Sequence, residues 1–387
     1  MVEISNAPNP PKDETMPPQQ LEPPDRLSRL RGDRPPQPYS ARKITALTAN
    51  PACSRRAVLD ASGVDKTALA QRMGYEPRFG QSPFAIAREE AFKAFVKWGA
   101  YAELIRLLRE ELGVPVEEAK LQDLTDVGGI TTIAVRERET RSLIEAIAAG
   151  DQDRLILQNP VLTLEVAGQL AYLEPDALTH RIDGKFHVVA IRSFPAIDGQ
   201  ANPTAVAQTA KQAAVHVLAL RRAFAAAGLN AEQIANTFLL ICPKDFSSRP
   251  YLRQIDLRQE LDALAFQLTR LRRAENLVRD LPQTATLDTD RDPGELMESV
   301  GRLPASYVPD CLSFCEMARY CRDEAAAQAS PARLGSAVRN DLPGIDSTST
   351  ALAYLDRILP QGEEATETIE LLLAAERLHR LRRGDVA

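Results

Sequence analysis

Several residue types and patterns are scarce in this chain of 387 residues, and each scarcity excludes a class of protein. Five cysteines and no apolar signal-peptide core argue against a disulfide-rich secreted scaffold, so a reducing cytoplasm is expected. No apolar run approaches the roughly eighteen residues of a membrane helix, so no membrane span is expected. The formal net charge of −6 excludes a coat protein that binds nucleic acid through overall basicity.

The few cysteines that are present are unevenly placed. Cys311, Cys315 and Cys321 follow a C-x3-C-x5-C spacing, and Cys53 lies far upstream. Four thiolates can close an iron–sulfur cluster, which would join two distant parts of the chain. A zinc ion is the rival ligand, although the C-x2-C pair of a zinc ribbon is missing, and ordinary buried thiols are the third interpretation. Cys242 lies in an apolar run and is expected to pack in the core.

The chain is expected to contain a disordered start, a folded middle and a helical end. Residues 1–40 are rich in proline and charge, which predicts disorder. Apolar periodicity then predicts an α/β domain over 41–325, followed by a helical tail over 326–387. The expected helices are 84–112, 140–149, 203–227 and 254–279, and the expected strands are 161–167, 171–180, 186–194 and 237–243.

The segment from Glu174 to Pro195 resembles the core of PD-(D/E)XK nucleases, in particular the RecB-like exonucleases that include those of CRISPR adaptation. In that family a Pro-Asp precedes a Glu-x-Lys on the next strand, and a Gln-x3-Tyr follows on a helix. Four cysteines, one early and three late, bind a 4Fe–4S cluster. The resemblance covers roughly residues 41–325. It implies a restriction-endonuclease-like core, with a central mixed sheet flanked by helices, and a helical iron–sulfur cap.

The family pattern can be transferred residue by residue, and it is damaged. Asp176 matches the metal-binding Asp, and Gln212 matches the motif Gln, although His216 replaces the Tyr. Ala190 stands where the second carboxylate belongs, and Arg192 stands where the Lys belongs. In the family, two carboxylates hold Mg²⁺ or Mn²⁺, which activates water, and the Lys stabilises developing negative charge. The resemblance therefore implies an impaired metal site at Asp176, with Cys53, Cys311, Cys315 and Cys321 as cluster ligands.

A relocated carboxylate is the alternative to an impaired site. Glu165 on the preceding strand, or Asp198 after the third, could replace the missing Glu as a catalytic metal ligand. Three hypotheses follow. The first is a DNA-binding module, impaired in cleavage, that works in DNA processing or defence against phage, with a possible protein partner. The second is an active metal-dependent DNA exonuclease, and the third is a redox-sensing iron–sulfur protein.

The hairpin around Asp183-Gly184 decides which side chains meet. A three-residue loop, 182–184, would pair Arg181 with Lys185, and counting back along both strands places Asp176 opposite Ala190. A two-residue turn would move Asp176 to the other face unless a bulge intervenes.

Basic residues in or near this core could contact phosphates, and an ion-paired surface is the alternative. They are Arg55, Arg56, Arg181, Arg192, Lys211, Arg221, Arg222, Lys244 and Arg249.

Overall fold

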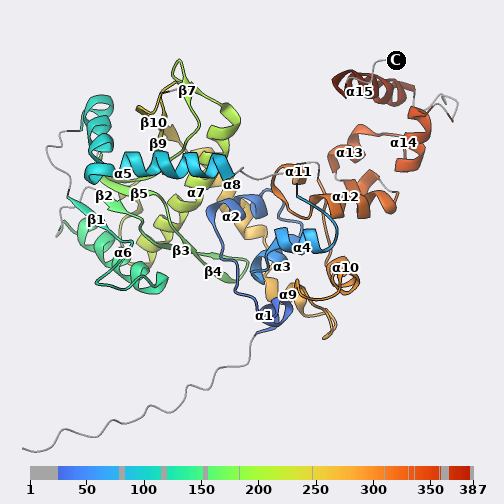
Figure 1. Ribbon diagram of the computed structural model, residues 1–387, viewed down its shortest axis with the longest axis horizontal. Helices are drawn as coiled ribbons and strands as arrows, with labels where there is room; N and C mark the ends of the chain where they lie inside the picture. The colour runs from blue at the N-terminus through green and yellow to red at the C-terminus, as the bar shows by residue number, and fades with distance from the viewer. Residues whose placement is uncertain are drawn as a thin grey trace, which may run out of the picture.

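The computed structural model describes residues 25–77, 83–114, 120–150, 156–182, 184–245, 247–308, 310–329, 331–334, 336–356, 358 and 366–383. Two lobes stand side by side in Figure 1. One is built around a sheet, and we call it the sheet lobe. The other is helical, and in it blue segments from early in the chain lie beside orange segments from much later.

The sheet lobe contains a six-stranded mixed sheet of order β1-β2-β5-β6-β9-β10. The pairs β1–β2 and β6–β9 are parallel, and the other neighbouring pairs are antiparallel. The strands are β1 Leu121–Asp123, β2 Ile156–Gln158, β5 Ala177–Ile182, β6 Lys185–Ile191, β9 Ile234–Pro243 and β10 Pro250–Asp256. The expected α/β class with a mixed central sheet is therefore confirmed.

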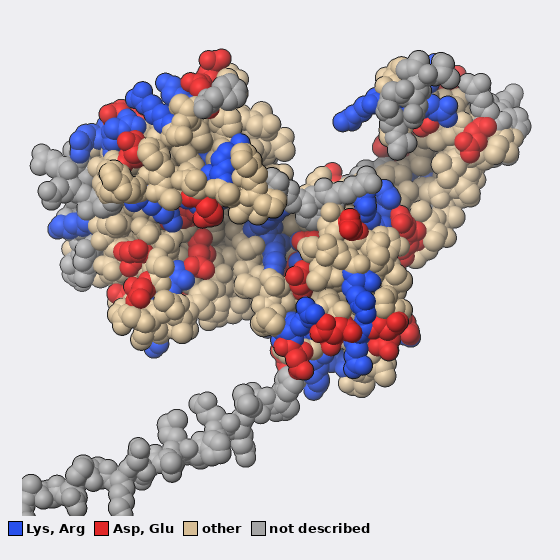
Figure 2. Space-filling view, in the orientation of Figure 1, with Lys and Arg blue, Asp and Glu red and all other residues tan. Residues whose placement is uncertain are grey.

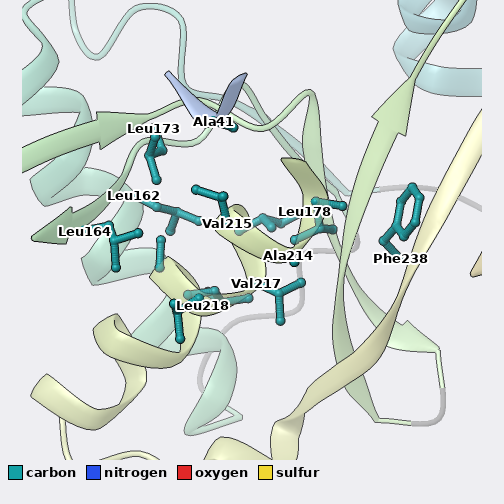
Figure 3. Packing of buried hydrophobic residues seen from close by; sticks show 14 of the residues in the cluster. Ala41, Leu162, Leu164, Leu173, Leu178, Ala214, Val215, Val217, Leu218 and Phe238 are labelled. Atoms are coloured by element: carbon teal, nitrogen blue, oxygen red, sulfur yellow. The ribbon is translucent and has the colours of Figure 1, made fainter. Parts of the chain in front are cut away.

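Helices cover both faces of this sheet, which explains why β6 is buried along nearly its whole length. Helix α7, Pro203–Ala226, begins at the Asn202 cap and connects the parallel strands β6 and β9. Its Ala- and Leu-rich face packs on one side of the sheet, where Figure 3 shows Val215 and Leu218 near Leu162 and Leu164. Helix α5, Pro83–Leu112, packs on the opposite side, in a second core.

Smaller elements complete the sheet lobe. Two hairpins, β3 Leu162–Val166 with β4 Gln169–Leu173 and β7 Ala196–Ile197 with β8 Gln200–Ala201, lie outside the main sheet. The remaining helices of this part are α2 Ala41–Thr48, α6 Ile133–Ala148, the short η1 Ala231–Gln233 and α8 Arg258–Arg270. Helix α2 packs against both α7 and α8.

The helical lobe has its own apolar core, which includes Cys311, Cys315 and Cys321. Cys53 is buried directly before the helix of this lobe that begins at Ser54. We call this lobe the cysteine lobe. Its helices are α1 Arg26–Arg31, α3 Ser54–Ala61, α4 Lys66–Arg72, α9 Ala274–Val278, α10 Pro293–Gly301, α11 Cys311–Phe314 and α12 Ala318–Ala327. Two segments more than 200 residues apart in the sequence thus form one core.

The C-terminal part is helical, as expected. After η2 Pro331–Leu334 come α13 Ser336–Asp341, α14 Thr348–Leu355 and α15 Thr366–Arg383, and a small core holds the last three together. Figure 1 shows these helices projecting beyond the cysteine lobe. None of the helices in the described part of the chain is long and apolar enough to cross a membrane.

Three expectations from the sequence need correction. The single strand expected over 171–180 is two strands, because β4 ends at Leu173 in a separate hairpin and β5 begins at Ala177 in the main sheet. Disorder does not extend over 25–40, because α1 buries Leu27 and Leu30 in the cysteine lobe and Asp25 caps the helix; residues 1–24 lie outside the described residues. The helix expected over 254–279 is in fact three elements. Its first residues, Gln254 to Asp256, pair with β9 and end β10, and the helical part is divided between α8 and α9.

Candidate functional site

The hairpin brings Asp176 and Ala190 to the same face of the sheet. Ala177 pairs with Val189 and Leu178 with Val188, so the next position along the ladder sets Asp176 opposite Ala190. The turn differs from the expected one, because Ile182, not Arg181, pairs with Lys185. A two-residue turn alone would point Asp176 and Ala190 to opposite faces of the sheet. A bulge between Thr179 and Ile182 shifts the register by one residue and returns both side chains to the same face. The expected facing is therefore confirmed, and the expected loop is wrong.

These residues open into a cleft of about 720 Å³ between the sheet, α5, α7 and the start of α2. We call it the Asp176 cleft. Its charged lining is mixed, and Figure 2 shows both signs of charge near the hollow between the two lobes. The cations are Arg42, Lys93 and Arg192, and the carboxylates are Glu89, Glu174 and Asp176. Ser313 of the cysteine lobe also reaches the cleft, so both lobes border it.

Both oxygens of Asp176 have partners within the chain. Oδ2 accepts hydrogen bonds from the backbone N–H of Ile191 at 2.9 Å and from Nη1 of Arg192 at 2.9 Å. Oδ1 lies 3.2 Å from Nζ of Lys93, and the same Nζ lies 3.3 Å from Oε1 of Glu89. The Lys93 ammonium therefore stands between the two carboxylates of Glu89 and Asp176, where it balances their charge.

The electrostatics of the cleft follow from this network. Burial alone would raise the pKa of Asp176, but Arg192, Lys93 and the N–H of Ile191 together hold that pKa below its usual value. Burial alone would lower the pKa of Lys93, yet the carboxylates of Asp176 and Glu89 hold it above its usual value. Asp176 is thus an ionised carboxylate whose charge is compensated by protein cations.

Helix α7 supplies Gln212 and His216 to the cleft. Nη2 of Arg192 lies 3.5 Å from Oε1 of Gln212, so Gln212 stands beside the ion pair of Asp176 and Arg192. His216, one turn later, also lines the cleft. Burial, helped by the positive charge of Arg192, lowers the pKa of His216 to about 4. His216 is therefore a neutral imidazole at physiological pH.

The structure does not bring the proposed substitute carboxylates to this cleft. Glu165 lies on β3, in the separate hairpin, where its side chain is 69% exposed and is 3.8 Å from Arg273. Asp198 is exposed in the turn between β7 and β8 and bonds through its backbone to Asp245. Neither residue lines the Asp176 cleft. The carboxylate that accompanies Asp176 is Glu89, from α5.

A divalent metal does not fit the Asp176 cleft as it stands. A metal needs free carboxylate oxygens, whereas those of Asp176 already bind Lys93, Arg192 and Ile191. Ala190 offers no oxygen in place of the family's Glu. Within the described residues, no three Cys, His, Asp or Glu side chains are arranged to hold one metal ion.

The four predicted cluster cysteines do come together. Cys53 directly precedes α3, and Cys311 is the first residue of α11. Cys315 directly follows α11, and Cys321 lies within α12. Each is at most 8% exposed, and all have free thiols. Cys53 contributes to the pKa values of Cys311 and Cys321, and Cys321 contributes to that of Cys315, so each of the four lies near at least one of the others.

The chemistry of this group fits an iron–sulfur cluster held by Cys53, Cys311, Cys315 and Cys321. Such a cluster would be held by these four thiolates, one for each iron. Burial raises the pKa of Cys315 to about 12 and that of Cys321 to about 11, so without a metal both thiols keep their protons. Cys242 is buried in β9 in the sheet lobe, as its apolar neighbours indicated.

Sequence reasoning placed several cations wrongly and missed others. Arg55 and Arg56 were candidates for phosphate contacts, but they are 2% and 3% exposed and lie among the cysteines. Lys211 is exposed on α7 and lines a different depression. Two residues that were not predicted line the cleft. They are Tyr39, inside the segment expected to be disordered, and the cation Arg42, just after it. The signal that could have found them is Ser40, which caps α2 just after Tyr39.

Comparisons with known proteins add little to this geometry. No family model matches the chain, and no curated protein matches it. Among solved structures, the one titled "Crystal structure of SSO0001" is similar, with 13% identity over 45% of this chain and 87% of that chain. Its TM-score of 0.18 is too low to support an argument about fold or function.

Proposed function

We propose that the protein is a DNA-binding member of the RecB-like PD-(D/E)XK nucleases, impaired in metal-dependent cleavage, with a 4Fe–4S cluster in its cysteine lobe. One observation carries the proposal. Asp176, Ala190, Arg192 and Gln212, chosen by their order in the sequence, converge in one cleft at the hairpin and α7. Positions that the resemblance singled out from sequence order alone therefore line one cleft, and this supports the proposal.

Impairment follows from what occupies the cleft. In an intact site of this family, a divalent metal activates water and neutralises phosphate charge. Here Lys93 and Arg192 neutralise Asp176, and Ala190 supplies no second carboxylate. Arg192 is also a poor substitute for Lys, because its planar fork is engaged by Asp176 and by the carbonyl of Ile191. The site therefore suits the binding of a charged group better than the activation of a water molecule for cleavage.

Phosphate binding is the activity that these cations can supply. Arg42, Lys93 and Arg192 line one hollow, and contacts of this kind bind nucleic acid without reading its sequence. Because Asp176 competes with a phosphate for two of these cations, binding is expected to be weak at physiological salt. The proposal places this binding in DNA processing or in defence against phage, together with a protein partner.

A salt-dependent titration with a fluorescent oligonucleotide tests the proposal. The unaltered protein should bind several sequences alike, with affinity that falls steeply as salt rises. Asp176→Asn should bind at least several-fold more tightly, because it frees Lys93 and Arg192. Arg192→Ala should bind more weakly, while Lys211→Ala, outside the cleft, is the matched control and should change little. An affinity that stays the same at all salt concentrations and in Asp176→Asn would contradict DNA binding at this cleft.

A digestion assay separates this proposal from the active-exonuclease alternative. With Mg²⁺ or Mn²⁺, the unaltered protein should leave single- and double-stranded DNA intact. Cleavage at an ordinary nuclease rate that Asp176→Ala abolishes would show that the cations do not block the metal. Glu89, the other carboxylate beside Lys93, would then be the first candidate for the missing ligand.

A further inference from the structure

The segment around Cys53 supplies a donor to each of the other three cysteines. Nδ2 of Asn50 lies 3.6 Å from Sγ of Cys311, and Nη1 of Arg55 lies 3.1 Å from Sγ of Cys321. The Arg56 guanidinium interacts with Cys315. Seven consecutive residues, 50–56, therefore carry one sulfur and the donors to three others.

Arg55 is the most firmly held of these donors. Its side chain is 2% exposed, and Nε donates to the carbonyl oxygen of Leu303 at 3.1 Å. Nη1 and Nη2 each donate to one oxygen of Glu324 at 2.9 Å, and the ring of Tyr320 lies against the guanidinium. With its fork fixed at three sides, Arg55 must keep Nη1 directed at Cys321.

A hydrogen bond to a ligating sulfur, or a buried positive charge beside it, stabilises the more negative state of an iron–sulfur cluster. One-electron reduction adds one negative charge without making or breaking a bond to the protein. Buried charge is felt strongly because little water screens it. A cation at 3.1 Å from a ligand sulfur should therefore favour the reduced state.

We propose that Arg55 raises the reduction potential of the cluster held by the four cysteines, and that Glu324 moderates this effect. The inference rests on the proposed function, since it requires that the cluster be present. Glu324 holds the Arg55 fork in place and also brings a negative charge that opposes reduction. Removing Arg55 and removing the charge of Glu324 should thus change the potential in opposite directions.

A redox titration with dithionite as the one-electron donor, followed by electron paramagnetic resonance, tests this inference on the full chain. Arg55→Met should lower the equilibrium constant for reduction at least tenfold, which corresponds to about 59 mV for one electron. Arg55→Lys, which keeps the charge but not the fork, should fall between Arg55→Met and the unaltered chain. Glu324→Gln should raise the potential. Lys66→Met is the matched control, because Lys66 is an equally buried cation of the same lobe whose ammonium bonds to Asp60 at 2.5 Å.

The opposite signs make the test robust against a general loss of structure. A purely structural role for Arg55 would move Arg55→Met and Glu324→Gln in the same direction, or would move Lys66→Met as much, and either result overturns the inference. If Arg55→Met retains no iron, the Arg55→Lys and Glu324→Gln shifts still decide it. Iron in the unaltered chain with unshifted potentials in the variants contradicts only the role of Arg55. A chain that binds no iron overturns the proposed cofactor as well.

Discussion

The Asp176 cleft and the cysteine lobe both bury groups that could bind metal, but they balance charge in different ways. In the cleft, the carboxylate of Asp176 is ionised, and Lys93 and Arg192 already compensate it. In the cysteine lobe, burial raises the pKa values of Cys315 and Cys321, so the thiols are neutral. The nearby guanidiniums of Arg55 and Arg56 are balanced by carboxylates instead.

The charge balance of each region determines whether a metal ion can bind there. A cation that enters the cleft must displace Lys93 or Arg192, and it finds no second strand-borne carboxylate. A metal that binds the cysteines replaces only protons, and the resulting negative charge meets donors that are already in position. The two regions therefore predict opposite responses to metal and to substitution.

The largest effect is expected from breaking the cysteine lobe. Cys321→Ser should abolish iron binding and destabilise this lobe by more than about 5 kcal/mol, because ligand binding energy is also folding energy. Iron content, brown colour and thermal unfolding of anaerobically purified protein measure the change. Cys242→Ser, in the sheet lobe, is the control and should keep both iron and colour. A folded, colourless protein with stoichiometric zinc would refute the iron–sulfur interpretation.

The second effect comes from rebuilding the cleft. Combining Lys93→Gln with Ala190→Glu and Arg192→Lys removes the ammonium between the carboxylates and restores the family pattern. This triple variant should bind Mn²⁺ at least tenfold more tightly than the unaltered protein, as measured by calorimetry. Adding Asp176→Asn to the triple variant should remove the gain. Equal Mn²⁺ affinity before and after the changes would mean that Lys93 does not block the site.

A smaller effect concerns pH and His216. Its pKa in the folded protein is about 4, against an ordinary value of about 6.5, so the unfolded chain binds more protons between these values. The free energy of unfolding should therefore fall by up to about 3 kcal/mol as pH drops from about 6.5 to 4. Urea unfolding of His216→Gln should lack this part of the slope, whereas His379→Gln, on the exposed face of α15, should retain it. An identical slope in His216→Gln would place the titration elsewhere.

The smallest effect is expected at Glu165. Its side chain is exposed and paired only loosely with Arg273, so Glu165→Ala should change stability by less than about 0.5 kcal/mol. DNA binding and Mn²⁺ affinity should also stay the same. If Glu165→Ala abolished a metal-dependent cleavage of DNA, the relocated-carboxylate hypothesis would regain support.

The sequence predicted the parts of the fold that repeat a strong pattern. The long helices α5 and α7 and the buried strand β9 carry apolar periodicities that identify them, and the close spacing of Cys311, Cys315 and Cys321 agrees with their place in one core. β10 was missed because its residues Tyr251–Asp256 are mostly polar on one side, and only pairing with β9 fixes them as a strand. Local sequence does not reveal which partner a polar edge strand finds.

The candidate site was predictable in its strand-borne residues and not in its cations. Asp176 and Arg192 lie next to the hairpin strands, so counting residues back from the turn places them on the sheet. The bulge between Thr179 and Ile182, which brings Asp176 to the predicted face, has no signal in the sequence. Lys93 reaches Asp176 from α5, and Arg55 reaches Cys321 from α3; both contacts depend on how distant elements pack. Long flexible side chains of this kind take their role from tertiary structure.

Elemental analysis of one sample tests the contrast between the two regions most directly. The protein would be purified without oxygen, equilibrated with Mn²⁺, passed through a desalting column and analysed for iron, zinc and manganese, alongside Asp176→Asn. We expect about four irons per chain, as a four-iron cluster requires, with neither zinc nor retained manganese. Stoichiometric zinc without iron, or manganese that is retained by the unaltered chain and lost in Asp176→Asn, would contradict this expectation.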